Sequence, residues 1–213
     1  MTARGYAPRT GGATARPIAS ADLPSRATPG SFVLRRRLLG AMALAPLAGC
    51  SPRLNWREVL LPEAQCVVAL PDKPQRTERE LDLAGRKVTM SMTSTGVGPS
   101  LFALGVARLP AEAISAEALP GTLAWFRDGL LRNVQGKLTA TEPAPLRVPA
   151  GRKLLAAEAI RAQGQVASGR GAELAARFYV VDDRLYQLVA LAAQGEVGAD
   201  ALATFFDSFR LLD

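Results

Sequence analysis

Residues 173–191 of the chain read ELAARFYVVDDRLYQLVAL. Every second residue in the first half of this stretch is apolar, which predicts a strand over 173–181 with one face toward a core. A second strand is predicted over 184–191, and the pair Asp182-Asp183 between them suits a tight turn. The stretch therefore predicts a β-hairpin, which makes a sheet the framework of the fold.

Six further strands are predicted upstream of the hairpin, in stretches that turn-forming residues separate from one another. They cover residues 56–61, 66–70, 78–83, 87–93, 101–108 and 137–142, with a loop at Gly96–Ser100. Residues 152–161 are ambiguous, because their Ala, Leu, Glu and Arg content favours a helix on propensity alone. The turn that precedes them and the need for sheet neighbours favour a strand, and we interpret them as a strand.

Two segments change to helical periodicity. The first opens at Gly121-Thr122 and ends between Asn133 and Gly136, and the second covers residues 199–209. Their sheet-facing stripes are Leu123, Phe126, Leu130 and Val134 in the first, and Leu202, Phe205, Phe206 and Phe209 in the second. We therefore predict a single α+β domain over residues 57–213, with an antiparallel β-sheet flanked by helices.

A secretory signal precedes this domain. Arg35-Arg36-Arg37 is followed by an apolar run from Leu38 to Ala48 and then by small residues before Cys50, which is the layout of a signal peptide over 33–49. The run is too short to span a bilayer, which takes about 20 residues.

The end of this signal, Leu47-Ala48-Gly49-Cys50, resembles the lipobox of bacterial lipoproteins. That resemblance implies that Cys50 is lipidated, with acyl groups such as palmitate, and becomes the first residue of the mature protein. Residues 50–56 would then be a lipidated tether, and two or more acyl chains make such an attachment stable. By the sorting rule of enteric bacteria, Ser51 favours the outer membrane over the inner one, on the periplasmic side.

The arginines leave two export routes open. Arg35 and Arg36 resemble the pair of a twin-arginine signal, but Leu34 stands where Ser or Thr is usual and Gly40 where Lys is common. The other interpretation is the general secretion route, which needs only positive charge before the apolar run.

Residues 1–32 contain scattered arginines, glycines and prolines and almost no apolar periodicity. Such a segment cannot bury a core, so we expect it to be disordered. The alternative is that translation starts further on, for example at Val33, and that residues 1–32 are not translated.

The basic character of the chain lies in its first part. The formal net charge is +7, but seven of the 26 Lys and Arg residues and only one of the 19 acids precede Cys50. The mature part is therefore nearly neutral. It lacks the basic face of a nucleic-acid-binding protein, so nucleic acid is not an expected partner.

Catalytic and metal-binding patterns are missing from the sequence. The chain has no histidine, no nucleophile elbow, no phosphate-binding loop and no dinucleotide fingerprint, so we predict no cofactor, no metal site and no enzyme. Cys66 is alone once Cys50 is lipidated, and its apolar surroundings indicate a small buried hydrophobe. Gly169-Arg170-Gly171 either wraps an anion through its amides or is a glycine turn between strands.

The arrangement of motifs in the mature chain is similar to that of PsbP-like bacterial lipoproteins. The motifs are Leu70-Pro71 with Pro74, Ala124-Trp125-Phe126-Arg127, Gly151-Arg152-Lys153, Arg184-Leu185-Tyr186-Gln187-Leu188 and Phe206-Asp207-Ser208-Phe209-Arg210. The resemblance covers nearly all of the mature chain and implies a PsbP-like α/β/α sandwich. PsbP itself is an accessory protein of photosynthetic water oxidation, and neither that role nor any ligand residue is carried over.

Two functions follow from these observations. The first is a membrane-tethered, non-enzymatic binding or accessory module, whose sheet, or the groove between sheet and helix, meets another envelope protein. The second is a cell-envelope hydrolase that uses two carboxylates across a cleft. The acids available for it are Glu158, Glu173, Asp182 and Asp183.

Overall fold

The computed structural model of the chain describes residues 54–166 and 169–213. The predictions for residues 1–32, for the signal at 33–49 and for Cys50 lie outside the described residues. Within them the chain is an α+β fold of antiparallel strands and two α-helices, as predicted. No helix among the described residues combines the length and the apolar character needed to cross a membrane.

Seven strands build a large antiparallel sheet. They are β3 (Gln75–Leu83), β4 (Arg86–Val97), β5 (Ser100–Arg108), β6 (Lys137–Pro143), β7 (Leu154–Gln165), β8 (Gly171–Val181) and β9 (Arg184–Ala193). Their order across the sheet is β3-β4-β5-β9-β8-β7-β6. The ambiguous residues 152–161 lie mostly in β7, which confirms the interpretation as a strand.

The predicted hairpin is β8–β9, and it lies inside the sheet between β7 and β5. Its turn is made by Asp182 and Asp183, and Asp182 adopts a φ of 54°. Asp tolerates this left-handed conformation better than most residues do. Because the hairpin is central, the side chains of both of its faces are buried.

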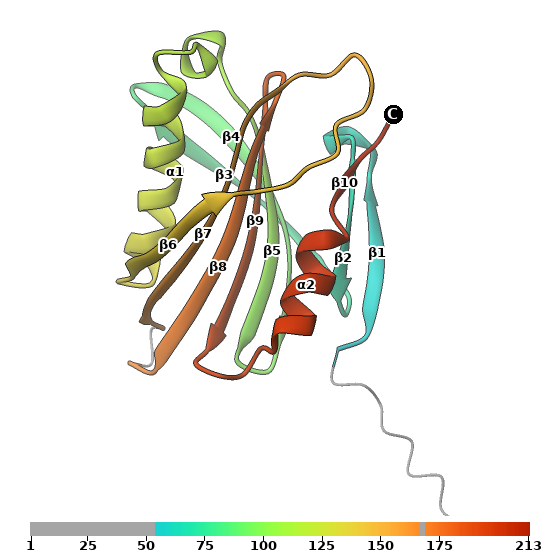
Figure 1. Cartoon of the computed structure of the whole chain (residues 1–213), viewed down its shortest axis with the longest axis vertical. Coiled ribbons are helices and arrows are strands. Elements are labelled where there is room, and N and C mark those ends of the chain that lie inside the picture. Colours follow the sequence, from blue (N-terminus) through green and yellow to red (C-terminus); the bar gives the residue numbers. More distant parts are fainter. Residues whose placement is uncertain (1–53, 167–168) are drawn as a thin grey trace, which may run out of the picture. The chain divides into compact units, whose positions relative to one another are not determined.

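Helix α1 (Leu119–Asn133) covers one face of the sheet, after a short 3₁₀ turn, η2 (Ala111–Ile114) (Figure 1). Its buried residues join the alternate positions Leu174, Ala176, Phe178 and Val180 of β8 in one apolar cluster. Leu123, Phe126 and Val134 are buried as predicted.

The opposite face is covered by helix α2 (Ala199–Asp207) and a second, three-stranded sheet (Figure 1). That sheet has the order β1-β2-β10 and consists of β1 (Trp56–Leu61), β2 (Cys66–Pro71) and β10 (Arg210–Leu211). A 3₁₀ turn, η1 (Pro62–Ala64), joins β1 to β2. Phe205 is fully buried here and packs edge-on against Phe102 with ring centroids 5.3 Å apart.

Several predicted boundaries were wrong. The loop predicted at Gly96–Ser100 is only the turn Gly98-Pro99, because β4 and β5 continue their pairing to Val97 and Ser100. The second helix ends at Asp207 rather than at 209, where the Ser208 hydroxyl donates to the Phe205 carbonyl at 2.7 Å and accepts from the Ala69 amide at 2.8 Å. Strand β10 and the division into two sheets were not predicted.

A network of hydrogen bonds, here called the polar lock, connects the β8–β9 turn to the loop between β6 and β7. The Lys153 amide donates to one oxygen of Asp182 at 2.9 Å, and Arg152 Nε donates to the other at 2.9 Å. Arg152 Nη2 also donates to the Tyr186 hydroxyl at 3.4 Å, and that hydroxyl donates to the Ala64 carbonyl at 2.9 Å. The Lys153 amide, and next the Arg152 side chain, hold the pKa of Asp182 below its ordinary value of 3.8.

Asp182→Asn is expected to lower the free energy of unfolding at pH 7 by about 1 kcal/mol or less, since the side chain is 41% exposed and solvent screens its ion pair. A lowered folded-state pKa gives stability that is present above the ordinary pKa of 3.8 and is lost as the pH falls through the folded value. Denaturant unfolding across pH 2–7 should therefore show the difference between variant and wild type shrinking below about pH 4.

The control is Glu80→Gln, which removes a carboxylate from an exposed ion pair with Lys87 and should leave the pH profile nearly unchanged. A difference between Asp182→Asn and wild type that stays constant over the whole pH range would contradict a role for the Asp182 charge.

Candidate functional site

A groove of about 500 Å³ lies between α1 and the large sheet. It is bounded by α1 on one side and by residues of β3, β4, β5 and β9 on the other, with Leu174 of β8 at its inner edge. Helix α1 packs toward β7, so one helix does not cover the whole width of a seven-stranded sheet. The groove is the part of the sheet that α1 leaves open.

The floor of the groove is apolar and adaptable. Met90 and Met92 of β4 lie over Gly105 of β5, where an added Cβ would come within 2.5 Å of Met90 Cε and 2.9 Å of Met92 Sδ. The glycine thus provides the space that the two methionines occupy. Their unbranched thioether side chains can repack around different shapes, and Leu101, 39% exposed, extends the apolar floor to its end.

Helix α1 forms the wall with Trp125, Phe126, Gly129 and Leu130. An added Cβ at Gly129 would meet only Arg132 Nη2, at an ordinary distance of 3.8 Å, so packing within the protein does not require a glycine there. A glycine inside a helix costs about 0.5–1 kcal/mol relative to alanine. Its effect here is to widen the groove.

Gln187 of β9 is the most deeply buried of the polar residues of the floor, which also include Thr77 and Ser94. Its side chain lies on the α1 side of the sheet between Gly105 and Phe178, and the residue is only 4% exposed. Among the described residues its amide group has no hydrogen-bond partner. The enclosed side-chain polar atoms without a partner in the described residues are Arg152 Nη1 and Arg184 Nη1, so the Gln187 amide still reaches the solvent in the groove.

The charged residues that line the groove are both arginines, and no carboxylate is among its lining residues. Arg132 is in the last turn of α1, where a cation compensates the carbonyl end of the helix. Arg79 projects from β3 on the same face as Thr77. Within the described part of the chain, neither arginine forms an ion pair.

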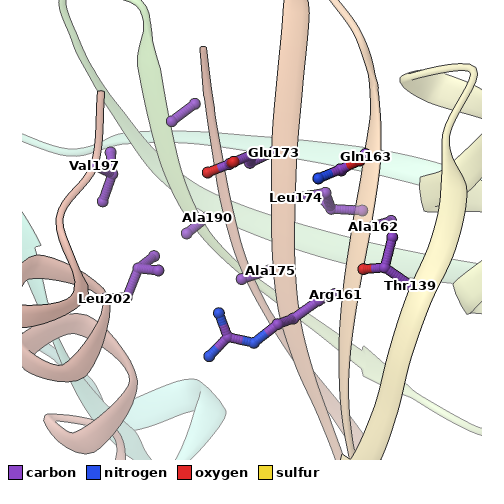
Figure 2. A pocket seen from close by; sticks show the side chains of 11 residues that line it. Thr139, Arg161, Ala162, Gln163, Glu173, Leu174, Ala175, Ala190, Val197 and Leu202 are labelled. Carbon is purple, nitrogen blue, oxygen red and sulfur yellow. The ribbon is translucent and has the colours of Figure 1, made fainter. Parts of the chain in front are cut away.

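Two smaller hollows adjoin each other on the opposite face, between α2 and strands β6 to β8. Their volumes are about 190 and 280 Å³, and both are lined by Arg161, Ala175 and Leu202. Figure 2 shows the Arg161 side chain reaching into the first of them, over a floor of small residues that includes Ala175 and Ala190. Because alanines form the floor, this face offers less apolar area than the α1 groove.

The four acids of the hydrolase hypothesis do not share a cleft. Glu158 lies on the α1 face and accepts from Arg127 Nη1 at 3.3 Å, whereas Glu173 lines the hollow on the α2 face (Figure 2). Asp182 is held in the polar lock, and Asp183 pairs with Arg108 Nε at 3.0 Å. In the described residues no group of three or more Asp, Glu and Cys residues could hold a metal ion.

Cys66 is completely buried, as predicted, and burial raises the pKa of its thiol to about 12. It is therefore a thiol at any physiological pH and a poor nucleophile. Gly169-Arg170-Gly171 is the turn between β7 and β8, where the Gly169 amide donates to the Val166 carbonyl at 2.8 Å. This hydrogen bond agrees with the turn interpretation, and anion binding by the same residues stays a prediction.

The hypothesis from the sequence named a groove between sheet and helix, but it did not identify the residues that line it. One signal was present, since Gln187 interrupts the inward apolar positions Leu185 and Val189 of the second hairpin strand. Gly129 inside the helical stripe was another. Which strands α1 leaves uncovered depends on the order of the strands in the sheet, and the periodicity of each strand does not contain that information.

Comparisons with known proteins found distant structural likeness. The chain is similar to the solution structure of cyanobacterial PsbP (CyanoP) from Synechocystis sp. PCC 6803, with 12% identity and a TM-score of 0.45 over 79% of this chain and 98% of that one. It is also similar to the crystal structure of PA94, a protein of unknown function from Pseudomonas aeruginosa, with 14% identity and a TM-score of 0.34 over 66% of this chain and 85% of that one. No family model matches the chain, and no curated protein matches it.

Gln187→Leu is expected to raise the free energy of unfolding by up to about 1 kcal/mol, because it replaces an amide that only solvent in the groove can bond with an apolar group of similar size. Urea denaturation of the full chain measures the change. The control, Gln163→Leu on exposed β7 surface, should change stability by less than about 0.5 kcal/mol. A loss of stability in Gln187→Leu would show that the amide has a partner inside the protein.

Proposed function

We propose that the protein is a non-enzymatic binding module of the bacterial cell envelope, tethered to a membrane through lipid on Cys50, and that it holds its partner in the groove beside α1. The observation that carries this proposal is the groove itself. It combines an apolar floor, a helix wall opened by Gly129 and the amide of Gln187, a residue that is 4% exposed and has no hydrogen-bond partner among the described residues. Polar groups placed in an apolar pocket are the usual composition of a binding site.

The carboxylate hydrolase receives no support from the geometry. A glycosidase needs two carboxyl groups across one cleft, about 5–10 Å apart. Glu158 and Glu173 lie on opposite faces of the sheet, and Asp182 is committed to the lock with Arg152 and Lys153. A binding role is therefore the better proposal, because it does not require two carboxylates in one cleft.

Filling the groove should abolish binding without unfolding the protein. Gly129→Leu adds a side chain to the groove wall, where its Cβ would make only an ordinary contact with Arg132 Nη2 at 3.8 Å, and a leucine also favours the helix. A neutral apolar dye such as Nile red should bind the full chain with enhanced emission, and Gly129→Leu should remove most of that signal.

The matched control is Gly121→Leu, in the same helix. Gly121 has open space around its Cα, but it does not line the groove, so dye binding should be unchanged. Equal dye emission from wild type and from both variants would contradict the proposed use of the groove.

The tether is tested by mass spectrometry of the membrane fraction. The native protein should yield a mature terminus at Cys50 carrying acyl mass, and Cys50→Ala should lose both the acyl mass and the membrane association, because acyl chains provide the anchor. An unmodified Cys50 that still carries the upstream residues would contradict the lipoprotein assignment.

A further inference from the structure

We infer that the groove beside α1 takes an extended, mainly apolar peptide segment of a partner protein, with a carboxylate that binds Arg79 and a backbone peptide group that binds Gln187. This inference rests on the proposed function, since it assigns a chemical class to the occupant of the same groove. Three features carry it: the Gln187 amide and the Arg79 guanidinium, neither of which has a partner in residues 54–166 and 169–213, and the distance between these two residues.

Gln187 distinguishes a peptide from a hydrocarbon. A primary amide offers both a donor and an acceptor, and in this floor both are nearly buried and unused within the described residues. An acyl chain would cover the amide without bonding it, which costs free energy. The main chain of an extended peptide presents a free N–H and a free C=O, whereas those of a helix interior are already paired with each other.

Arg79 identifies the charge of the ligand. The lining of the groove contains two guanidinium groups and no carboxylate, so an anion meets attraction without a competing repulsion. Arg132 already compensates the carbonyl end of α1, and an anion near that end would be repelled by the same carbonyls. Arg79 has no such role, and the Thr77 hydroxyl beside it on β3 is a further donor for a carboxylate.

The spacing follows from the register of the sheet. Gln187 pairs with Gly105, Gly105 with Met92, and Met92 with Thr77, so these residues form one row across four strands. Three strand spacings are about 14 Å, and Arg79 lies two residues, about 7 Å, further along β3 than Thr77, so the Cα atoms of Gln187 and Arg79 are about 16 Å apart. An extended peptide advances about 3.3 Å per residue. The carboxylate therefore lies about four or five residues from the peptide group that Gln187 binds, and apolar side chains between them rest on the methionines.

The inference is tested by selecting peptides from a random phage-displayed library on the immobilised full chain. Enriched peptides should combine apolar residues with one Asp or Glu, and a synthetic copy should compete with Nile red for the groove. Its affinity should fall about fivefold with Gln187→Leu and about two- to fivefold with Arg79→Gln, and Gly129→Leu should abolish binding. Arg76→Gln, on the other face of β3, should leave the affinity unchanged.

A double-mutant cycle identifies the partner of Arg79 directly. Replacing the acid of the peptide by its amide should weaken binding to wild type but have little effect on Arg79→Gln, because the two changes remove the same interaction. Independent effects would overturn the assignment of the carboxylate to Arg79.

The outcomes separate this inference from the proposed function. Enriched peptides without an acid, or no enrichment while palmitate displaces Nile red from the groove, would overturn the peptide assignment and leave the groove as a binding site. If Gly129→Leu changes neither peptide binding nor dye binding, both the peptide assignment and the proposed function of the groove would be overturned.

Discussion

The burial of the β8–β9 hairpin on both faces is the constraint on which the rest of the structure depends. Leu174, Ala176, Phe178 and Val180 belong to the cluster under α1, while Tyr179, Val181 and Tyr186 belong to the cluster under α2 and the small sheet. A hairpin with two apolar faces has to be covered twice. Helix α1 covers one face, and helix α2 together with the small sheet covers the other.

The cover on the α2 side leaves two smaller hollows, and the cover on the α1 side leaves the groove of about 500 Å³. On the α2 side, aromatic contacts such as the stacked rings of Tyr179 and Phe209, with centroids 5.5 Å apart, fill the space between the layers. On the α1 side a single helix lies over a broad sheet, and the strands from β3 to β5 keep exposed apolar surface. The groove is a direct consequence of this difference in width, and Gly129 and Gln187 are among the residues that line it.

Periodicity was enough to predict the strands, the two helices and the α+β class, because each of these depends on local patterns of apolar residues. The ends of the helices and strands could be predicted less well from the sequence. Strand β10 has two residues and is defined by its pairing with Cys66 and Val67 of β2, so no local pattern could reveal it. The groove depends on strand order, which is a property of the assembled sheet, and the outcome of export and lipidation at Cys50 stays a prediction.

The small sheet joins the first and last described strands, since β2 pairs with β1 on one side and with β10 on the other. Residues that close the core on that side, including Phe205 and Phe209, leave the ribosome more than a hundred residues after β2. The core on that side therefore cannot close until nearly the whole chain has been synthesised, and a chain that lacks its last ten residues would leave β2 with an unpaired edge and the Tyr179 ring without its stacking partner.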